Sequence, residues 1–412
     1  MRILIVAVGS RGDVAPYTGL AARLGEAGHD VAIAAHEPFE EFVRERGIAF
    51  RPLPMDLRSE LGSDAGRGAL GGSPLALARF ARMYAARWAE MGEAILDASR
   101  DRDLLLLSAM GWLGIHVAEG LGIPSMGVYL QPLDPTREFP PALLTTRSLG
   151  GVGNRAAART LRAAGQAPFR SVVRDLRKRL GLPPIGAAAL FRRLERDAWP
   201  VHYGFSPRLV PRPADWPPGR DVVGYWWPEP VPDWKPPERL TDFLDAGPPP
   251  VYVGFGSMAL DDGERVARTV TDALRQAGMR GIVQAGWGEM VADASDDVLP
   301  VGDVPHDWLF PRTAAVVHHG GAGTTAAGLR AGVPTVAVPV AADQPFWAAR
   351  VRAAGAGPEG VPFRRLTAGA LAAAVREATA APYRDNAAKI AARLAGEDGA
   401  GAVVAAVARL AR

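Results

Sequence analysis

A stretch late in the chain, from His318 to Gln344, carries the groups best suited to bind a phosphate and a set of hydroxyls. It reads HHGGAGTTAAGLRAGVPTVAVPVAADQ. An apolar strand over Ala314–Val317 leads into the two histidines and a glycine-rich turn, and the pattern predicts a helix from about Gly323 to Ala331. The first N–H groups of a helix lack acceptors, and with the helix dipole they stabilise an anion by roughly 0.3–2 kcal/mol. The sequence therefore predicts a phosphate site at this turn.

The turn contains three types of hydrogen-bond donor for a phosphate oxygen: backbone N–H groups, a hydroxyl and an imidazole. Its glycines allow a ligand to approach the backbone closely. These groups belong to His319, Gly321, Gly323 and Thr324. A second apolar strand, Thr335–Pro339, is followed by Asp343 and Gln344, an acid and an amide that can hydrogen-bond hydroxyls. A ligand with phosphates at one end and hydroxyls at the other fits both features, and a nucleotide sugar is such a ligand.

Two other kinds of phosphate site fit the sequence less well. A P-loop requires a lysine after its glycines, and none follows here. A dinucleotide fingerprint requires a third glycine three residues after Gly321-Ala322-Gly323, and this is also missing. A tight turn without a ligand would explain the glycines alone, but it needs neither His318-His319 nor Asp343-Gln344.

The first half of the chain has the alternation of strands and helices that predicts a doubly wound parallel sheet. An apolar strand over Arg2–Val8 ends in the turn Gly9–Asp13, and a helix is expected from about Val14 to Ala27. Ligands bind beyond the carboxyl ends of the strands in such sheets. We therefore expect Asp13 to face a ligand, and Gln131, which follows the strand Ser125–Leu130, to lie at the same edge.

A proline-rich segment divides the chain. Thirteen prolines lie between Pro207 and Pro250, with little helical pattern, which indicates a stiff linker over 207–250 between domains 1–206 and 251–395. The second half then repeats the alternation of strands and helices. It begins with the strand Val251–Val253, which leads into Gly254-Phe255-Gly256-Ser257. The predicted class is α/β, with two domains of similar architecture that meet at a cleft.

Composition excludes several classes of protein. The net charge of +3 over 412 residues, with no long basic run, argues against a nucleic-acid partner. The chain has no cysteine, so disulfides, thiolate metal sites and a cysteine nucleophile are excluded. The apolar run Ile3–Val8 is too short for a signal peptide or a membrane span. We expect a cytoplasmic protein with at most peripheral membrane contact.

Taken together, these motifs resemble the donor-binding signature of the glycosyltransferases with two facing Rossmann-like domains, the GT-B fold of glycosyltransferase family 1. The resemblance covers nearly the whole chain and is strongest to the branch of sterol glucosyltransferases and bacterial natural-product glycosyltransferases. It implies that the final helix, residues 396–412, crosses back onto the first domain.

The resemblance also implies an activity. Such a protein would transfer a hexose, with inversion, from a UDP- or TDP-linked sugar to a hydroxyl of a hydrophobic small molecule, such as a polyketide or a sterol-like compound. The nucleotide sugar is a co-substrate, and neither a cofactor nor a metal is expected. We expect a monomer or a homodimer.

Roles for individual donor-site residues follow from the same resemblance. His319 would stabilise the leaving diphosphate, with Gly321, Gly323 and Thr324 beside it, while Asp343 and Gln344 would hold sugar hydroxyls. The backbone at Val304 and the side chain of His306 match the part of the signature that meets the nucleobase. Two residues have an alternative structural explanation: Ser257 is a phosphate donor or a helix cap, and Trp287 lines the donor site or packs in the core.

The catalytic base is expected in the first turn. Many relatives carry a histidine there, whereas this sequence has Asp13 in the matching region. Aspartate is a weak base at its ordinary pKa, and Asp13 could also cap the helix predicted from Val14. We predict that it is the base. His36 and His116 are the alternative bases, although each is better explained as a structural residue. The sequence Asp101-Arg102-Asp103 superficially matches a metal-binding motif of another glycosyltransferase fold, but it precedes a strand and is interpreted as a solvated turn.

Three other functions remain open from sequence. An epimerase on the same fold would need two acids that face the donor. A nicotinamide-dependent oxidoreductase would use Glu37 to bind ribose, although the missing glycine argues against it. A sugar-nucleotide sensor without catalysis is the third. The helix predicted over Leu75–Ala98 has a large apolar face, either core or the wall of an acceptor pocket.

Overall fold

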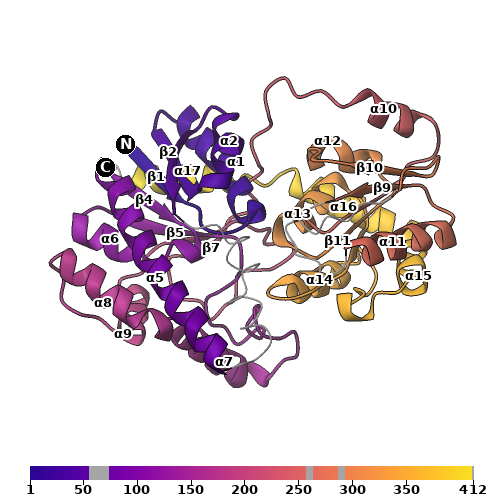
Figure 1. Cartoon of the computed structure of the whole chain (residues 1–412). Helices are drawn as coiled ribbons and strands as arrows, with labels where there is room; N and C mark the ends of the chain where they lie inside the picture. Colours follow the sequence, from indigo (N-terminus) through magenta and orange to yellow (C-terminus); the bar gives the residue numbers. More distant parts are fainter. Residues whose placement is uncertain (55–73, 257–262, 286–292, 411–412) are drawn as a thin grey trace.

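The computed structural model describes residues 1–54, 74–256, 263–285 and 293–410, with side chains described from residue 86 onward in the long helix that begins at Pro74. Two domains of the α/β class lie side by side (Figure 1). In the described part of the chain, the first domain contains a seven-stranded parallel sheet ordered β3-β2-β1-β4-β5-β6-β7. Its strands are β1 Arg2–Val6, β2 Asp30–His36, β3 Ala49–Leu53, β4 Leu104–Leu107, β5 Ser125–Tyr129, β6 Val201–Tyr203 and β7 Arg220–Val222.

Helices connect these strands. They are α1 Arg11–Glu26, η1 Glu37–Phe39, α2 Glu40–Arg44, α5 Pro74–Ser99, η2 Ala109–Gly111, α6 Gly114–Leu121, α7 Gly150–Gly165, η3 Ala167–Phe169, α8 Arg170–Arg179 and α9 Ala187–Arg196. On α5, Trp88 and Met91 are fully buried in the core, as the core interpretation of that helix predicted.

The second domain repeats the architecture on a smaller scale. Its described strands form a five-stranded parallel sheet ordered β10-β9-β8-β11-β12. They are β8 Val251–Gly254, β9 Gly281–Gln284, β10 Val298–Val301, β11 Ala315–His318 and β12 Thr335–Ala337. The helices of the linker and of the second half are α10 Glu238–Asp245, α11 Gly263–Ala277, α12 His306–Leu309, η4 Phe310–Arg312, α13 Ala322–Ala331, α14 Gln344–Ala353, η5 Phe363–Arg365, α15 Ala368–Ala378, α16 Ala381–Leu394 and α17 Gly399–Leu410.

Both sheets reverse their strand order next to the first strand of the domain. The order reverses between β1 and β4 in the first sheet and between β8 and β11 in the second. Loops that leave such neighbouring strands in opposite directions open a crevice at the carboxyl edge, where ligands bind in doubly wound folds. The turns after β1 and β11 therefore lie at these two crevices.

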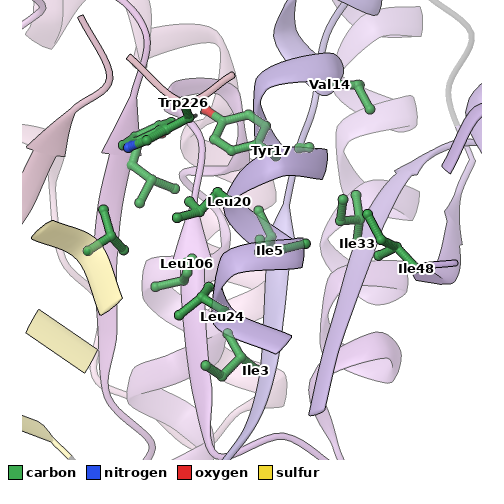
Figure 2. Packing of buried hydrophobic residues seen from close by; sticks show 14 of the residues in the cluster. Ile3, Ile5, Val14, Tyr17, Leu20, Leu24, Ile33, Ile48, Leu106 and Trp226 are labelled. Carbon is green, nitrogen blue, oxygen red and sulfur yellow. Dashed lines mark hydrogen bonds between the residues drawn. The ribbon is translucent and has the colours of Figure 1, made fainter. Parts of the chain in front are cut away.

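Buried packing fixes helix α1 over the first sheet (Figure 2). Leu20 and Leu24 are completely buried against Ile3 and Ile5 of β1. The hydroxyl of Tyr17 donates to the carbonyl oxygen of Val128 at 2.7 Å. This bond connects the first half of α1 to β5, which lies two strands from β1 in the sheet. The N-terminus of α1 is thereby held at the ligand edge.

The segment predicted as the linker, 207–250, contains a strand and a helix. The strand β7 extends the first sheet beyond β6, with Tyr203 opposite Val222. The linker also contains the helix α10. The strand β7 has only three residues and lies within the proline-rich segment, so neither its length nor its pattern gave a strand signal.

Two helical regions of the chain are divided into shorter helices. The region Arg155–Leu180 divides into α7 and α8, and Pro168 lies in the short turn between them. The closing region Ala387–Leu410 divides into α16 and α17. After this break α17 lies among the first domain's elements (Figure 1), where Val403 and Val407 are completely buried in the same core as α1.

Candidate active site

The first domain contributes Asp13, in the first turn of α1. Helix α1 begins at Arg11 with Ser10 as its N-cap, so the predicted start at Val14 was wrong and Asp13 is the third residue of the helix. Its Oδ2 accepts hydrogen bonds from the backbone N–H and the hydroxyl of Ser10, both at 2.9 Å. This is the reciprocal arrangement of a capping box, and it orients the carboxylate.

Gly9 makes room for that carboxylate. Its φ is +145°, in the region that favours glycine, and a Cβ placed on it would lie 2.5 Å from Oδ2 of Asp13. The other carboxylate oxygen, Oδ1, lies 3.5 Å from Nε2 of Gln131, beyond the end of β5. Burial raises the pKa of Asp13, and the hydrogen bonds from Ser10 and Gln131 lower it in part. A carboxylate with a raised pKa is a stronger base than the ordinary aspartate assumed from sequence.

In the second domain, the turn after β11 presents N–H groups that have no acceptor in the described part of the chain. The N–H of Gly320 donates to Nδ1 of His318 at 2.9 Å, and Gly320 has a φ of +87°. Helix α13 then starts at Ala322, and the N–H of Thr325 already donates to the carbonyl of Gly321. The preceding N–H groups, those of Ala322, Gly323 and Thr324, have no place in the helical ladder and remain available to an anion.

His319 lies against this helix start. A Cβ on Gly321 would be 2.4 Å from Nε2 of His319, and one on Gly256 would be 3.3 Å from its Cε1, so two glycines make room for the ring. Its Nδ1 is buried and has no hydrogen-bond partner among the described residues. Burial lowers the pKa of His319 to about 4, so the ring is neutral at pH 7 and carries one N–H.

Asp343 and Gln344 are at the start of α14, next to the same turn. The Oε1 of Gln344 accepts from the N–H groups of Val340 at 2.8 Å and Ala341 at 3.0 Å, which shapes the loop around Ala342 at a φ of +56°. The indole N–H of Trp347 donates to Oδ2 of Asp343 at 2.8 Å. Burial raises the pKa of Asp343, and the nearby Asp13 carboxylate raises it further.

The amide of Gln131 connects the two halves of the site. It hydrogen-bonds Asp13 and lies near Asp343, and it lowers the pKa of both carboxylates. The two carboxylates, one from each domain, are therefore neighbours. Close by, Nη2 of Arg11 pairs with Oδ2 of Asp303 at 2.5 Å, and α1 contacts α13. The structure thus places the first turn of α1 opposite the start of α13.

The residues matched to the nucleobase lie at the start of α12, which contacts α13. The side chain of Val304 is buried in the core. The ring of His306 stacks on Phe310, with ring centres 4.3 Å apart, and meets Tyr252 edge-on. Burial lowers the pKa of His306 to about 4. Ser257 and Trp287 lie outside the described residues.

A cavity of about 300 Å³ opens in the first domain, next to Gln131. Pro132 and Leu133, which directly follow Gln131, line it, and its remaining wall is mostly apolar and aromatic. The main contributors are Trp112, Tyr129, Phe139, Leu161, Phe191 and Trp199. Its charged side chains neutralise one another, since Asp134 accepts from Arg162 at 3.0 Å and from Arg220 at 2.8 Å. The arrangement suits a largely apolar ligand.

The remaining candidates have structural explanations. The Nδ1 of His116 lies 3.1 Å from Nη1 of the buried Arg177, and His36 is fully buried. Asp101 and Asp103 pair with Arg51 and Arg2 at the surface, as the solvated-turn interpretation predicted. Among the described residues, no group of three or more acidic or histidine side chains is arranged to hold a metal ion. Within that same part of the chain, no helix is long and apolar enough to cross a membrane.

Sequence reasoning missed the bridging role of Gln131 and the composition of the cavity. The position of Gln131 directly after a parallel strand was a usable signal, because it placed the amide at the ligand edge. The proximity of Asp13 and Asp343 had no signal in the sequence, since the two residues belong to different domains.

Family models match both ends of the chain. The glycosyltransferase family 28 N-terminal domain matches residues 3–97, and the erythromycin biosynthesis protein CIII-like C-terminal domain matches residues 277–410. A sterol 3-beta-glucosyltransferase of Arabidopsis thaliana, UGT80B1, is 36% identical over 420 residues, which cover 98% of this chain and 67% of that protein. A sterol 3-beta-glucosyltransferase of Neurospora crassa is 35% identical over 378 residues, 87% of this chain and 24% of that protein. The chain thus spans about two thirds of the plant relatives and a quarter of the fungal one.

Solved structures share the fold over the whole chain. The glycosyltransferase VinC, in complex with dTDP, superposes with a TM-score of 0.69 at 21% identity, covering 100% of this chain and 99% of that one. The glycosyltransferase of kitacinnamycin gives a TM-score of 0.68 at 20% identity, covering 99% and 98%. These similarities establish two facing Rossmann-like domains as the architecture.

Proposed function

The chain belongs to family 1 of the GT-B glycosyltransferases and is a sugar-nucleotide-dependent glycosyltransferase for a hydrophobic acceptor; we propose that it is an inverting hexosyltransferase with Asp13 as its base. The observation that carries this proposal is the position of Asp13. Its carboxylate, on the first domain, faces the start of α13 and neighbours Asp343 on the second. A base on one domain and an anion site on the other are the two groups that a displacement at the anomeric carbon requires.

In the proposed reaction the acceptor hydroxyl attacks the anomeric carbon from the Asp13 side. The new carbon–oxygen bond forms as the bond from that carbon to the diphosphate oxygen breaks. The proton passes from the hydroxyl to Asp13, and the nucleoside diphosphate leaves with the bonding electrons. Attack and departure on opposite faces invert the configuration. Such base catalysis contributes roughly 10²–10⁴-fold to the rate.

The start of α13 would stabilise the leaving diphosphate. The N–H groups of Ala322, Gly323 and Thr324 point away from the helix ladder, and the neutral ring of His319 supplies one further N–H. Donors that are fixed before the reaction stabilise the charge that develops on the leaving oxygen. We propose that no metal ion or other cofactor takes part, and that a chelator leaves the turnover rate unchanged.

Asp343 would hold hydroxyls of the transferred sugar. Its carboxylate lies beside Asp13 and therefore next to the reacting carbon's expected position, and Gln344 beside it shapes the loop through its Oε1. The backbone at Val304 and the His306 ring would border the nucleobase. The apolar cavity beyond Gln131 would hold the acceptor, a polyketide or a sterol-like molecule.

The binding of donors tests this assignment. Calorimetry with UDP, TDP, UDP-glucose and NAD should show tight binding of one nucleoside diphosphate and of its sugar conjugate. The variant His319→Ala should weaken that binding at least tenfold, or about 1.4 kcal/mol. Binding of NAD instead, or an affinity that does not depend on His319, would show that the α13 turn does not hold a diphosphate.

Products distinguish transfer from the epimerase alternative. Asp13 and Asp343 are two neighbouring acids, which is the feature that an epimerase would need, but the family members identified here are transferases. Incubation of the donor without an acceptor should leave the sugar configuration unchanged. We further propose a cytoplasmic monomer or homodimer with at most peripheral membrane contact.

A further inference from the structure

Positive charge is concentrated in one part of the first domain. The stretch from Arg137 to Arg196, which contains α7, α8 and α9, has 13 arginine and lysine residues against 3 aspartate and glutamate residues. The net charge of the whole chain is only +3, so the remainder of the chain is acidic on balance. Such an asymmetry between parts of one chain favours an anionic partner for the basic part.

Exposed apolar side chains gather at the start of the same stretch. Leu143, Leu144, Leu149 and Val152 are 47%, 59%, 53% and 72% exposed, and they account for four of the seven large apolar side chains that are exposed among the described residues. They fall within ten residues of the chain. Single exposed apolar residues are normal on a soluble protein, whereas a local group of them marks an interaction surface.

This apolar group borders the mouth of the cavity. Leu143 is exposed and also lines the cavity, together with Pro140 and Pro141 before it and Leu161 of α7. The exposed leucines therefore continue outward from the apolar wall of the cavity. Helix α7 lies at the lower edge of the first domain in Figure 1.

Arginines without an acidic partner surround the apolar group. Arg147 lies between Leu144 and Leu149 in the chain, and a Cβ on Gly151 would be 3.3 Å from the Cβ of Arg137. Arg159 follows Val152 by two turns on the exposed face of α7. Within the described residues, these three arginines form no ion pair, unlike Arg155 and Arg162 on the same helix. The charges of Arg137 and Arg147 are thus available to a partner, while Arg159 shares a small pocket with Asp134, Glu195 and Asp215.

We propose that this surface, formed by residues 137–152 and the exposed face of α7, docks on an anionic lipid bilayer. Apolar side chains enter the interface while surrounding arginines meet the lipid phosphates, as in other peripheral proteins. A second copy of the chain on the same surface would bring like charges together. The proposal rests on the function above in one respect: a lipophilic acceptor would pass from the bilayer through the cavity mouth at Leu143.

Vesicle binding by the full chain tests the proposal. Co-sedimentation should show binding to phosphatidylcholine vesicles that contain phosphatidylglycerol, weaker binding to phosphatidylcholine alone, and a decrease as salt is added. The double variant Leu144→Gln/Leu149→Gln should weaken the binding at least tenfold. The variant Arg147→Glu/Arg159→Glu should remove the preference for the anionic lipid.

Matched substitutions elsewhere control for general effects of charge and polarity. Arg364→Glu/Arg365→Glu, at an exposed turn of the second domain, and Leu410→Gln, at the exposed end of α17, should bind vesicles as the wild type does. Absence of wild-type binding, or equal binding by the surface variants, would overturn the proposal. So would self-association through this surface without vesicle binding.

The affinity for the nucleoside diphosphate, measured on the same preparations, separates this proposal from the proposed function. All four variants should keep the wild-type nucleotide affinity, because none of the substituted residues lies at the donor site. If the wild type binds the vesicles but no nucleoside diphosphate, the proposed glycosyltransferase function is contradicted and the membrane proposal is not.

Discussion

Two carboxylates and one imidazole at the cleft have pKa values shifted in opposite directions by the same cause. Burial disfavours the charged form of any group, so it raises the pKa of Asp13 and Asp343 and lowers that of His319. The consequence is a base that is stronger than an ordinary aspartate, beside a neutral donor of hydrogen bonds. Both properties suit a site in which a proton is taken on one side and a diphosphate leaves on the other.

Substitution of Asp13 tests the base directly. Asp13→Asn preserves the size of the side chain and can still accept at Oδ1, so helix α1 should remain folded. Transfer should fall by roughly 10²–10⁴-fold, the usual contribution of a general base, while the affinity for the nucleoside diphosphate stays unchanged. Steady-state kinetics and calorimetry on the same preparation measure the two quantities. A variant that retains more than a tenth of the activity would contradict the assignment.

Substitution of Gln131 should move the pH dependence of the reaction. Gln131→Met keeps the length of the side chain but removes the amide that lowers the pKa of Asp13 and Asp343. The base must be ionised, so the rate rises with pH through its pKa, and the rising limb of the profile should shift to higher pH. At pH values on that limb, the loss should be roughly tenfold.

A purely structural role for Gln131 would lower the rate equally at all pH values. The variant Gln131→Asn, with the amide retained but shortened, provides a comparison. It should shift the limb less than Gln131→Met, because its amide can still reach one of the two carboxylates.

At the scale of elements, glycines in the turn after β11 decide where the imidazole lies. Gly321 has almost no space for a side chain, since a Cβ would approach Nε2 of His319 to 2.4 Å. Gly321→Ala should therefore displace the ring and weaken nucleoside diphosphate binding at least as much as His319→Ala does, roughly tenfold or more. Gly25→Ala in α1, where a Cβ meets nothing within 4 Å, is the matched control and should bind normally.

Elements with a strong pattern were predicted well, and those with a weak pattern were not. The apolar strands β1 and β11 and the helix stop at Gly332, with a φ of +69°, correspond to what the sequence indicated. The start of α1 was placed three residues too late, because Arg11 and Gly12 carry no helix signal of their own. The strand β7 was missed because three residues beside prolines are shaped by their neighbour β6 rather than by their own propensity.

At the scale of the whole molecule, the site exists because apolar contacts hold the domains together. Phe205 of the first domain meets the edge of Trp347 with ring centres 5.7 Å apart, and Phe139 packs against Phe346 at 5.5 Å. Trp347 also donates to Asp343, so the same side chain that seals the interface orients a carboxylate in the site. Helix α17 adds a second crossing between the domains.

The buried histidines should make the folded protein sensitive to acid. Burial lowers the pKa of His116, His306 and His319 to about 4 each, whereas an unfolded histidine has a pKa near 6.5. Between these values the unfolded chain binds more protons, so the free energy of unfolding falls as pH falls, by up to about 1.4 kcal/mol per pH unit for each group. The raised pKa values of Asp13 and Asp343 act in the opposite direction but involve fewer groups.

Thermal unfolding between pH 7 and pH 5 measures this effect, and Tm should decrease steadily across the range. His116→Gln removes one titrating group outside the proposed donor site. The decrease of Tm between pH 7 and pH 5 should therefore be smaller by the contribution of one histidine, even if the variant has a lower Tm at pH 7. A saturating nucleoside diphosphate should reduce the share of His319, because a hydrogen bond to phosphate favours a protonated ring. A Tm that does not change with pH would contradict these shifts.

The sequence by itself determined the chemistry that each segment can perform. Turn glycines, helix starts and the types of side chain around them are local features, so the proposed anion site at His319–Thr324 and the edge position of Asp13 and Gln131 could be inferred from short stretches. The tertiary structure alone decided which of these groups meet. Asp13 and Asp343 are neighbours because two separately folded sheets pack through distant aromatic residues, and the cavity beyond Gln131 is closed by side chains from several elements. Contacts of this kind depend on how the surfaces of distant segments pack together, and short sequence patterns do not predict that packing.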